Sequence, residues 1–162
     1  MNLKNMLKIF GITASIITAA IQIWPAVEIG AEPKQDFRVA AQEVFPSDGV
    51  FKFEVMDFKD GRARHFIYKA SPDINIRFFI VESVENGVKA AFDACQACFR
   101  AKKGYVQQGK DMVCINCGLK FRIERINEAR GGCNPIPLQF SVQSNYAVIA
   151  EKDILQGTRF FQ

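Results

Sequence analysis

Apolar and charged residues alternate along the middle of the chain, and this spacing of two predicts β-strands. Phe51, Phe53 and Val55 are separated by charged residues. The turn-forming sequence Lys-Asp-Gly at residues 59–61 then leads into a second such stretch at residues 62–69. We therefore expect these two stretches to pair as a hairpin.

Two further strands are predicted on either side of an Asn-Gly turn. Residues 74–82 are strongly apolar, and residues 86–87 are Asn-Gly, a sequence typical of tight β-turns. The returning stretch, residues 88–94, leads directly into Cys95. The first of two Cys-x-x-Cys pairs is therefore expected at the end of a strand.

Shorter alternating stretches surround the second cysteine pair and continue to the C-terminus. Residues 105–113 predict a small hairpin, and residues 118–122 predict a strand that leaves the second pair. We therefore expect both cysteine pairs at the tips of hairpins. In the tail, residues 139–150 predict a strand and residues 151–156 a short helix that ends at Gly157.

These elements predict a mainly β fold: a small α+β, hairpin-rich domain with two cysteine knuckles, preceded by an N-terminal hydrophobic helix. Residues 1–31 are expected to be a signal or anchor segment, and residues 32–162 the cysteine-site domain. Within the domain we expect strands at about 37–94, metal-site hairpins at 95–138, and a C-terminal strand and short helix at 139–162.

The N-terminal segment has the features of an export signal or a membrane anchor. Lys4 and Lys8 precede residues 9–27, a run without any charge. About 20 apolar residues match the thickness of a bilayer, which favours an uncleaved inner-membrane anchor with the domain facing the periplasm. The small residues near Ala31 keep a cleaved signal and a soluble periplasmic protein as the alternative.

The charge distribution narrows the range of partners. The formal net charge is only +4, and no basic run alternates with aromatic residues, so we expect no nucleic-acid binding. Residues 95–133 nevertheless contain eight basic and three acidic residues. Such a face is often merely solvated, but it also suits a site that carries negative charge or an acidic partner.

Two Cys-x-x-Cys pairs are the strongest chemical signal in the sequence. Cys95 and Cys98 form the first pair, and Cys114 and Cys117 form the second after a spacer of fifteen residues. A two-residue spacer allows both sulfurs of a pair to occupy adjacent corners of a tetrahedron, which a second pair completes. Zinc, a single iron ion and an iron–sulfur cluster all accept such soft thiolate ligands.

The fifth cysteine, Cys133, lies in an irregular loop after Gly131 and Gly132 and before Pro135. Two consecutive glycines permit close approach of the backbone to another group. From the residues alone, Cys133 can be a fifth ligand, a disulfide partner or a buried thiol.

The cysteines and the single histidine allow other interpretations. Export to an oxidising compartment keeps disulfides open as an alternative. A thioredoxin-like motif is disfavoured because turn residues, not a helix, follow Cys98, and covalent haem is excluded because Phe99 and Gly118 replace the required histidine. His65 lies inside a predicted strand and is interpreted as structural. No pattern for hydrolytic catalysis is present.

Residues 92–138 carry the motifs of a known family. They read FDACQACFRAKKGYVQQGKDMVCINCGLKFRIERINEARGGCNPIPL. This stretch closely resembles the FtrD-like family of membrane iron–sulfur-containing proteins, whose pattern runs daC-x2-C, KGY, VCxNCGxxFxIxxIxxxxGGCNPxPL; the chain departs from it at Phe99. The resemblance implies an iron or iron–sulfur site at Cys95, Cys98, Cys114, Cys117 and Cys133, while the thiolate ligands themselves keep zinc as the alternative.

The resemblance further implies an electron-transfer component, not a catalyst, beside a ferrous-iron uptake system in the bacterial envelope. Its partners would be the membrane and a redox protein of that system. A preassembled cluster normally needs a twin-arginine export signal, and the N-terminus MNLKNMLK has none. Either the metal is therefore acquired after export, or the site is not a cluster. The alternative is a structural zinc or disulfide-stabilised module that binds a partner without redox activity.

Overall fold

The central sheet of the protein carries the candidate site at one of its ends. The computed structural model describes residues 40–128 and 130–162. Strand order in this sheet is β1-β3-β4-β5, with β1 parallel to β3 and the other pairs antiparallel. Its strands are β1 (Ala41–Glu43), β3 (Arg64–Ser71), β4 (Ile74–Ser83) and β5 (Gly87–Phe92).

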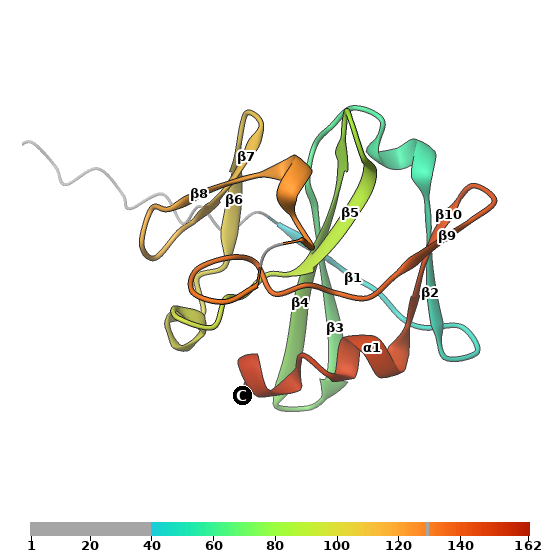
Figure 1. Cartoon of the computed structure of the whole chain (residues 1–162). Coiled ribbons are helices and arrows are strands. Elements are labelled where there is room, and N and C mark those ends of the chain that lie inside the picture. Colours follow the sequence, from blue (N-terminus) through green and yellow to red (C-terminus); the bar gives the residue numbers. More distant parts are fainter. Residues whose placement is uncertain (1–39, 129) are drawn as a thin grey trace, which may run out of the picture. The chain divides into compact units, whose positions relative to one another are not determined.

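Two three-stranded sheets accompany the central one, and Figure 1 shows them on opposite sides of it. The second sheet has the order β2-β10-β9, and the third has the order β6-β7-β8. Their strands are β2 (Val50–Glu54), β6 (Tyr105–Gln108), β7 (Asp111–Cys114), β8 (Lys120–Arg122), β9 (Ser141–Gln143) and β10 (Tyr146–Ala150). The helical elements are α1 (Glu151–Leu155) and the 3-10 turns η2 (Val55–Phe58), η3 (Phe99–Ala101), η4 (Ile123–Arg125) and η5 (Thr158–Phe160).

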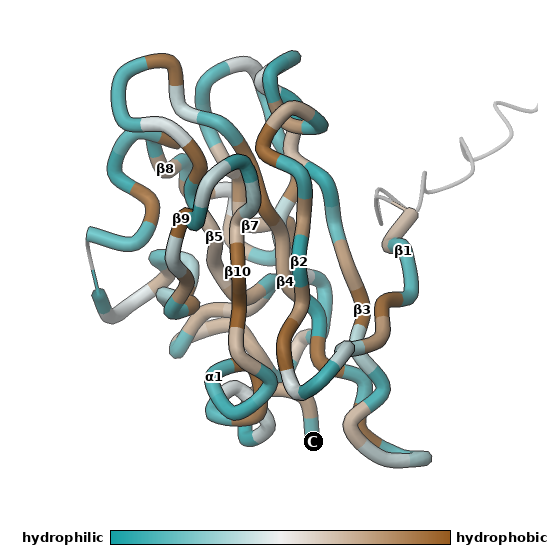
Figure 2. The backbone as a smooth tube through the Cα atoms, turned by 90° about the vertical axis from the view of Figure 1, so that its right-hand side faces the viewer, coloured by the Kyte–Doolittle hydropathy of each residue, from teal (hydrophilic) through white to brown (hydrophobic). Residues whose placement is uncertain are grey.

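Residues 78–81 of β4 are buried on both faces of the sheet, which explains why four apolar residues follow one another there. Phe78 and Ile80 lie in a core shared with the second sheet and α1, whereas Phe79 and Val81 lie in a core shared with the third sheet. Alternate side chains of a strand point to opposite faces, so a segment covered on both faces is apolar at consecutive positions. Figure 2 shows hydrophobic stretches along strands such as β10 and mostly hydrophilic connecting loops. The second of the two cores also contains Cys95 and Cys114.

Several predicted elements are confirmed, and the mainly β fold class with them. Strand β4 covers residues 74–83, and β5 begins directly after the turn at Gly87, whose φ is 66°. The hairpin expected at residues 105–113 is the β6–β7 hairpin, and the short helix expected at 151–156 is α1. His65 lies in a strand, as predicted.

The hairpin predicted between residues 51–56 and 62–69 is wrong. Strand β2 pairs with β10, with Phe51 opposite Ile149, while β3 pairs with β4 and β1. The 3-10 turn η2 follows β2 and buries Phe58, which is 1% exposed, in the first core. This turn redirects the chain from one sheet to another, so the local turn signal at 59–61 does not join two paired strands.

The C-terminal tail forms two strands where one strand was predicted. Residues 139–150 form the β9–β10 hairpin instead of one strand, with Ser144 in the left-handed region at the turn. The predicted N-terminal hydrophobic helix and the boundary at residue 31 lie outside the described residues. Within residues 40–128 and 130–162, no helix has the length and apolar character needed to cross a membrane.

Candidate metal centre

The five cysteines come from three segments that meet beside the end of the central sheet. Cys114 ends β7 and Cys117 lies in the loop to β8, so the second pair is at a hairpin tip, as predicted. Cys95 and Cys98 lie in the connection from β5 to β6. Their predicted place at a hairpin tip is wrong, because β5 and β6 belong to different sheets.

Backbone hydrogen bonds shape each knuckle. In the first, the Cys98 N–H donates to the Cys95 sulfur at 3.0 Å, and the Phe99 N–H donates to the Cys95 carbonyl at 3.1 Å. In the second, the Gly118 N–H donates to the Cys114 carbonyl at 2.8 Å. Gly118 has a φ of 74°, a conformation that glycine adopts without a steric penalty. Amide groups turned toward sulfur stabilise the thiolate form that metals bind.

The Cys133 loop is attached to the first knuckle. The Ala97 N–H donates to the Gly132 carbonyl at 3.1 Å, and the Cys98 and Cys133 sulfurs lie 3.6 Å apart. The Tyr105 hydroxyl, from β6, donates to the Cys133 carbonyl at 2.5 Å. Cys133 therefore belongs to the same cluster of thiols as the two pairs.

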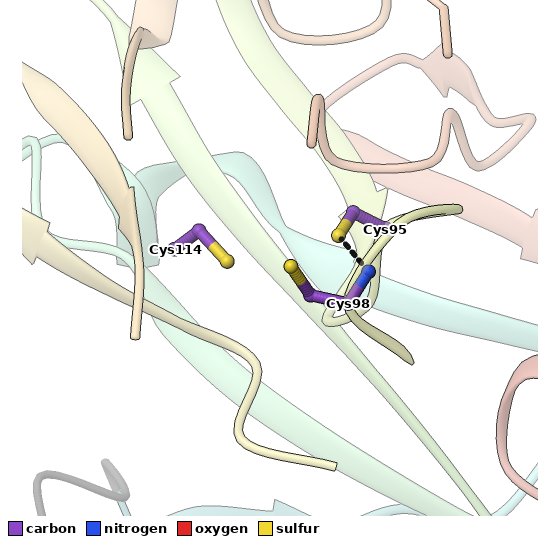
Figure 3. A group of neighbouring side chains, drawn as sticks. All are labelled: Cys95, Cys98 and Cys114. Atoms are coloured by element: carbon purple, nitrogen blue, oxygen red, sulfur yellow. Dashed lines mark hydrogen bonds between the residues drawn. The ribbon is translucent and has the colours of Figure 1, made fainter. Parts of the chain in front are cut away.

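The five sulfurs form two sets of three that share one member. The inner triad is Cys95, Cys98 and Cys114, and the outer triad is Cys98, Cys117 and Cys133; within each set all sulfurs lie within 4.8 Å of one another. Figure 3 shows the sulfurs of the inner triad turned toward a common space. The grouping differs from the expected set of two pairs, because each triad combines residues from different segments.

Burial decreases from the inner to the outer triad. Cys95 and Cys114 are each 2% exposed, Cys98 and Cys133 are half-buried, and Cys117 is exposed. A cavity of about 270 Å³ opens beside the inner triad. All three inner cysteines line it, together with Arg77, Lys102, Asn116 and Phe160 among other residues.

Asp93, two residues before the first cysteine, is the centre of a buried polar network. Its carboxylate accepts hydrogen bonds from the Tyr105 N–H at 2.7 Å and from Arg77 Nε at 3.2 Å, and it contacts His65 Nδ1 at 3.3 Å. Asp93 and His65 are 5% and 3% exposed. Through Asp93, which follows β5, the network joins β3, β4 and β6, and thereby ties the segment before Cys95 to the third sheet.

The backbone of Gly104 packs directly on this carboxylate. A side chain at Gly104 would bring Cβ to 2.4 Å from Asp93 Oδ1, and the φ of Gly104 is 73°. Glycine is therefore required here both for the close approach and for the backbone conformation.

The thiols differ in how readily they ionise. A hydrogen bond from the Asn116 side chain, followed by one from Cys133, lowers the pKa of Cys98 to about 7. Burial raises the pKa of Cys114 to about 12, and a hydrogen bond with Cys117 together with burial raises the pKa of Cys133. Cys98, the member shared by both triads, is thus more easily ionised than Cys114 or Cys133.

The donor set fits a thiophilic metal. The five thiols are free cysteines, and thiolates are the ligands preferred by zinc, by single iron ions and by iron–sulfur clusters. Two sulfurs bound about 2.3 Å from one tetrahedral ion lie about 3.8 Å apart. The 3.6 Å between Cys98 and Cys133 is close to that separation.

Four residues of the surroundings were missed by the sequence analysis: Asp93, Arg77, Asn116 and Tyr105. Asp93 and Asn116 stand within two residues of a cysteine, and Tyr105 follows the glycine of the KGY motif. Asp93, Asn116 and Tyr105 could therefore have been recognised as site residues from their positions in the cysteine and KGY motifs. Arg77 lies 16 residues before Asp93 in the sequence, and only strand pairing brings the two together.

A mainly β fold with a cluster of thiols in this arrangement defines a class of small cysteine-site proteins suited to binding metals. The chain belongs to the FtrD-like family, described as "Membrane iron-sulfur containing protein FtrD-like", whose model matches residues 58–161. This match confirms the resemblance noted from residues 92–138. Among curated proteins and among solved structures, none matches the chain.

Proposed function

We propose that this protein is an envelope electron-transfer component that binds iron or an iron–sulfur cluster and is associated with iron uptake. The observation that carries the proposal is the convergence of five free thiols from three separate segments into two overlapping triads. The proposed ligands are Cys95, Cys98, Cys114, Cys117 and Cys133. A metal bound there would supply a redox centre for single electrons.

The burial of the site supports this role. Cys95 and Cys114 lie in a hydrophobic core with Phe79 and Met112, which would shield a metal from water. Cys117 is exposed, so the opposite side of the site reaches the protein surface. A redox centre with one shielded side and one surface side can exchange electrons with a docked partner while its surroundings limit side reactions.

Charge around the site supports a thiolate centre as well. The segment from residue 95 to residue 133 contains eight basic and three acidic residues. Metal sites with four or more thiolates retain negative charge, and nearby cations lower the energy of that state. Lys102 lines the cavity next to the inner triad, and Arg77 does so as well.

Location and partners are proposed from the family and from the N-terminal sequence. The family is described as membrane proteins, and residues 9–27 are uncharged over a length that suits a membrane anchor. We propose an inner-membrane anchor in residues 1–31, with the cysteine-site domain of residues 32–162 in the periplasm. The proposed partner is a redox protein of the same iron-uptake system.

An absorption spectrum of the full chain, purified anaerobically in mild detergent, tests the function. We expect sulfur-to-iron charge-transfer bands that bleach on addition of dithionite, and metal analysis that detects iron. The Cys114→Ser variant should lose these bands, because it removes a buried ligand. Met56→Leu is the matched control, since it removes an exposed sulfur remote from the cysteine cluster in sequence and should keep the bands. A colourless protein that contains zinc would contradict the proposal.

The contact between Cys98 and Cys133 favours one alternative, a disulfide-stabilised module that binds a partner without redox activity. These sulfurs are 3.6 Å apart, and a small movement would bring them to the bond length of a disulfide, about 2.05 Å. Thiol counting on protein purified without reductant, then denatured and freed of metal, separates the two functions. Five thiols support the metal centre, and three or fewer support the disulfide module.

A further inference from the structure

The outer triad has the features of a second metal position. Cys98, Cys117 and Cys133 lie within 4.8 Å of one another, and so do Cys95, Cys98 and Cys114 of the inner triad. One tetrahedral ion has four corners, so it cannot bind all five sulfurs. If one ion bound both Cys-x-x-Cys pairs, the four sulfurs of those pairs would form one set, and Cys133 would be left over.

We propose that the outer triad takes a second thiophilic divalent ion from solution, and that the Cys98 thiolate bridges this ion to the metal of the inner triad. The inference rests on the proposed function, because it takes the inner triad as the resident metal position. It extends that function by making Cys133 a ligand of its own site and by assigning the exposed side of the cluster to metal entry.

The distances support a shared thiolate. Cys98 is the member common to both triads, and its sulfur lies 3.6 Å from that of Cys133. Sulfurs on one tetrahedral ion are about 3.8 Å apart, so these two can bind one ion without movement of the backbone. A thiolate has enough lone pairs to bind two metals. The Cys98 sulfur is the one positioned to do so, because it lies within 4.8 Å of the other four sulfurs.

Accessibility distinguishes the two positions. In the inner triad, Cys95 and Cys114 are each 2% exposed, and a cavity opens beside them. Cys117 is exposed, and the loop of Cys133 begins with Gly131 and Gly132, both with positive φ. An ion can therefore reach the outer triad directly from solvent, and its exchange should be faster there than at the inner triad.

Charge also favours two ions over one. Five thiolates with a single divalent ion leave three negative charges, and a second divalent ion leaves one. A half-buried cluster retains less uncompensated charge in the second case, which lowers the desolvation cost of ionising all five thiols.

Cobalt(II) titration of the full, reduced and metal-free chain in detergent under argon tests the proposal. Absorbance from sulfur-to-cobalt charge transfer should rise until two equivalents are bound. The electron paramagnetic resonance signal of high-spin cobalt should rise to one equivalent and then fall, because a thiolate bridge couples the two spins. Cys117→Ser should bind one equivalent with an uncoupled signal, and Cys133→Ser should do the same. Cys114→Ser, the matched control in the inner triad, should keep the outer equivalent.

Two results would overturn the inference: saturation of the wild-type chain at one equivalent, or two equivalents whose resonance signals simply add. Circular dichroism of each metal-free variant verifies folding, and exposed Cys117 is the position least able to disturb it. The outcome is separate from that of the proposed function. If the iron-loaded protein has no bands that bleach, the electron-transfer function is refuted, but the cobalt stoichiometry is unaffected. If the chain binds a single cobalt equivalent, the second metal position is refuted, but the inner triad can still hold a redox-active metal.

Discussion

Replacing Gly104 with alanine tests whether the contact with Asp93 holds the first knuckle in place. The new Cβ would lie 2.4 Å from Asp93 Oδ1 and 2.7 Å from Oδ2. The carboxylate has no room to withdraw, because it is buried and already bound by Tyr105, Arg77 and His65. Either the β6 backbone or Asp93 must therefore move, and the hydrogen bond between Asp93 and the Tyr105 N–H is lost.

The expected loss of stability follows from two contributions. An alanine with left-handed φ costs about 1–2 kcal/mol, and loss of a hydrogen bond to a charged group costs about 1.5–3 kcal/mol. Together they predict a decrease of about 2.5–5 kcal/mol in the free energy of unfolding. Gly109→Ala is the matched control, because Gly109 lies in the same hairpin with a φ of 60° and a methyl group there would have nothing within 4 Å. It should lose only about 1–2 kcal/mol.

Urea unfolding of the metal-free, reduced chain measures both values. Circular dichroism follows the β-structure, and equal slopes in the two variants show that the midpoints report stability alone. The Gly104→Ala variant should also bind less metal, because Asp93 precedes the first knuckle by two residues. Equal midpoints for Gly104→Ala and Gly109→Ala would refute the reasoning, since both share the backbone contribution and differ only in the contact.

Three further predictions follow from the site and the N-terminal sequence. Tyr105→Phe removes the hydroxyl that donates to the Cys133 carbonyl, and should lower the free energy of unfolding by about 1 kcal/mol; an unchanged urea midpoint would contradict this. In the metal-free protein, alkylation of Cys98 should accelerate as the pH rises through about 7, where its thiolate forms, and should be faster than alkylation of buried Cys114, whose pKa is raised; mass spectrometry of quenched samples gives the order, and Cys114 reacting before Cys98 would be inconsistent with it. If residues 9–27 are an anchor, the protein should remain in membranes through a carbonate wash with its N-terminus intact; a mature chain that begins near residue 32 in the soluble fraction would indicate a cleaved signal.

Local patterns in the sequence were sufficient for elements whose partner is adjacent along the chain. The Asn-Gly turn between β4 and β5 and the β6–β7 hairpin were both predicted, because a short turn determines which strands it joins. The two Cys-x-x-Cys pairs likewise indicated a thiol site, because the spacing brings both sulfurs of a pair together whatever the surrounding fold.

Long-range pairing was decided only by the tertiary structure. Strand β2 pairs with β10, almost a hundred residues later, and no turn signal between them encodes that choice. The same applies to the site: the contact of Cys133 with Cys98 and the grouping into two triads depend on three segments meeting at one end of the central sheet. The sequence by itself determined that five thiols are present and that four of them come in pairs. The packing of the sheets decides which sulfurs share a metal position. This packing is driven by the burial of apolar faces, which does not depend on how far apart the residues are in the sequence.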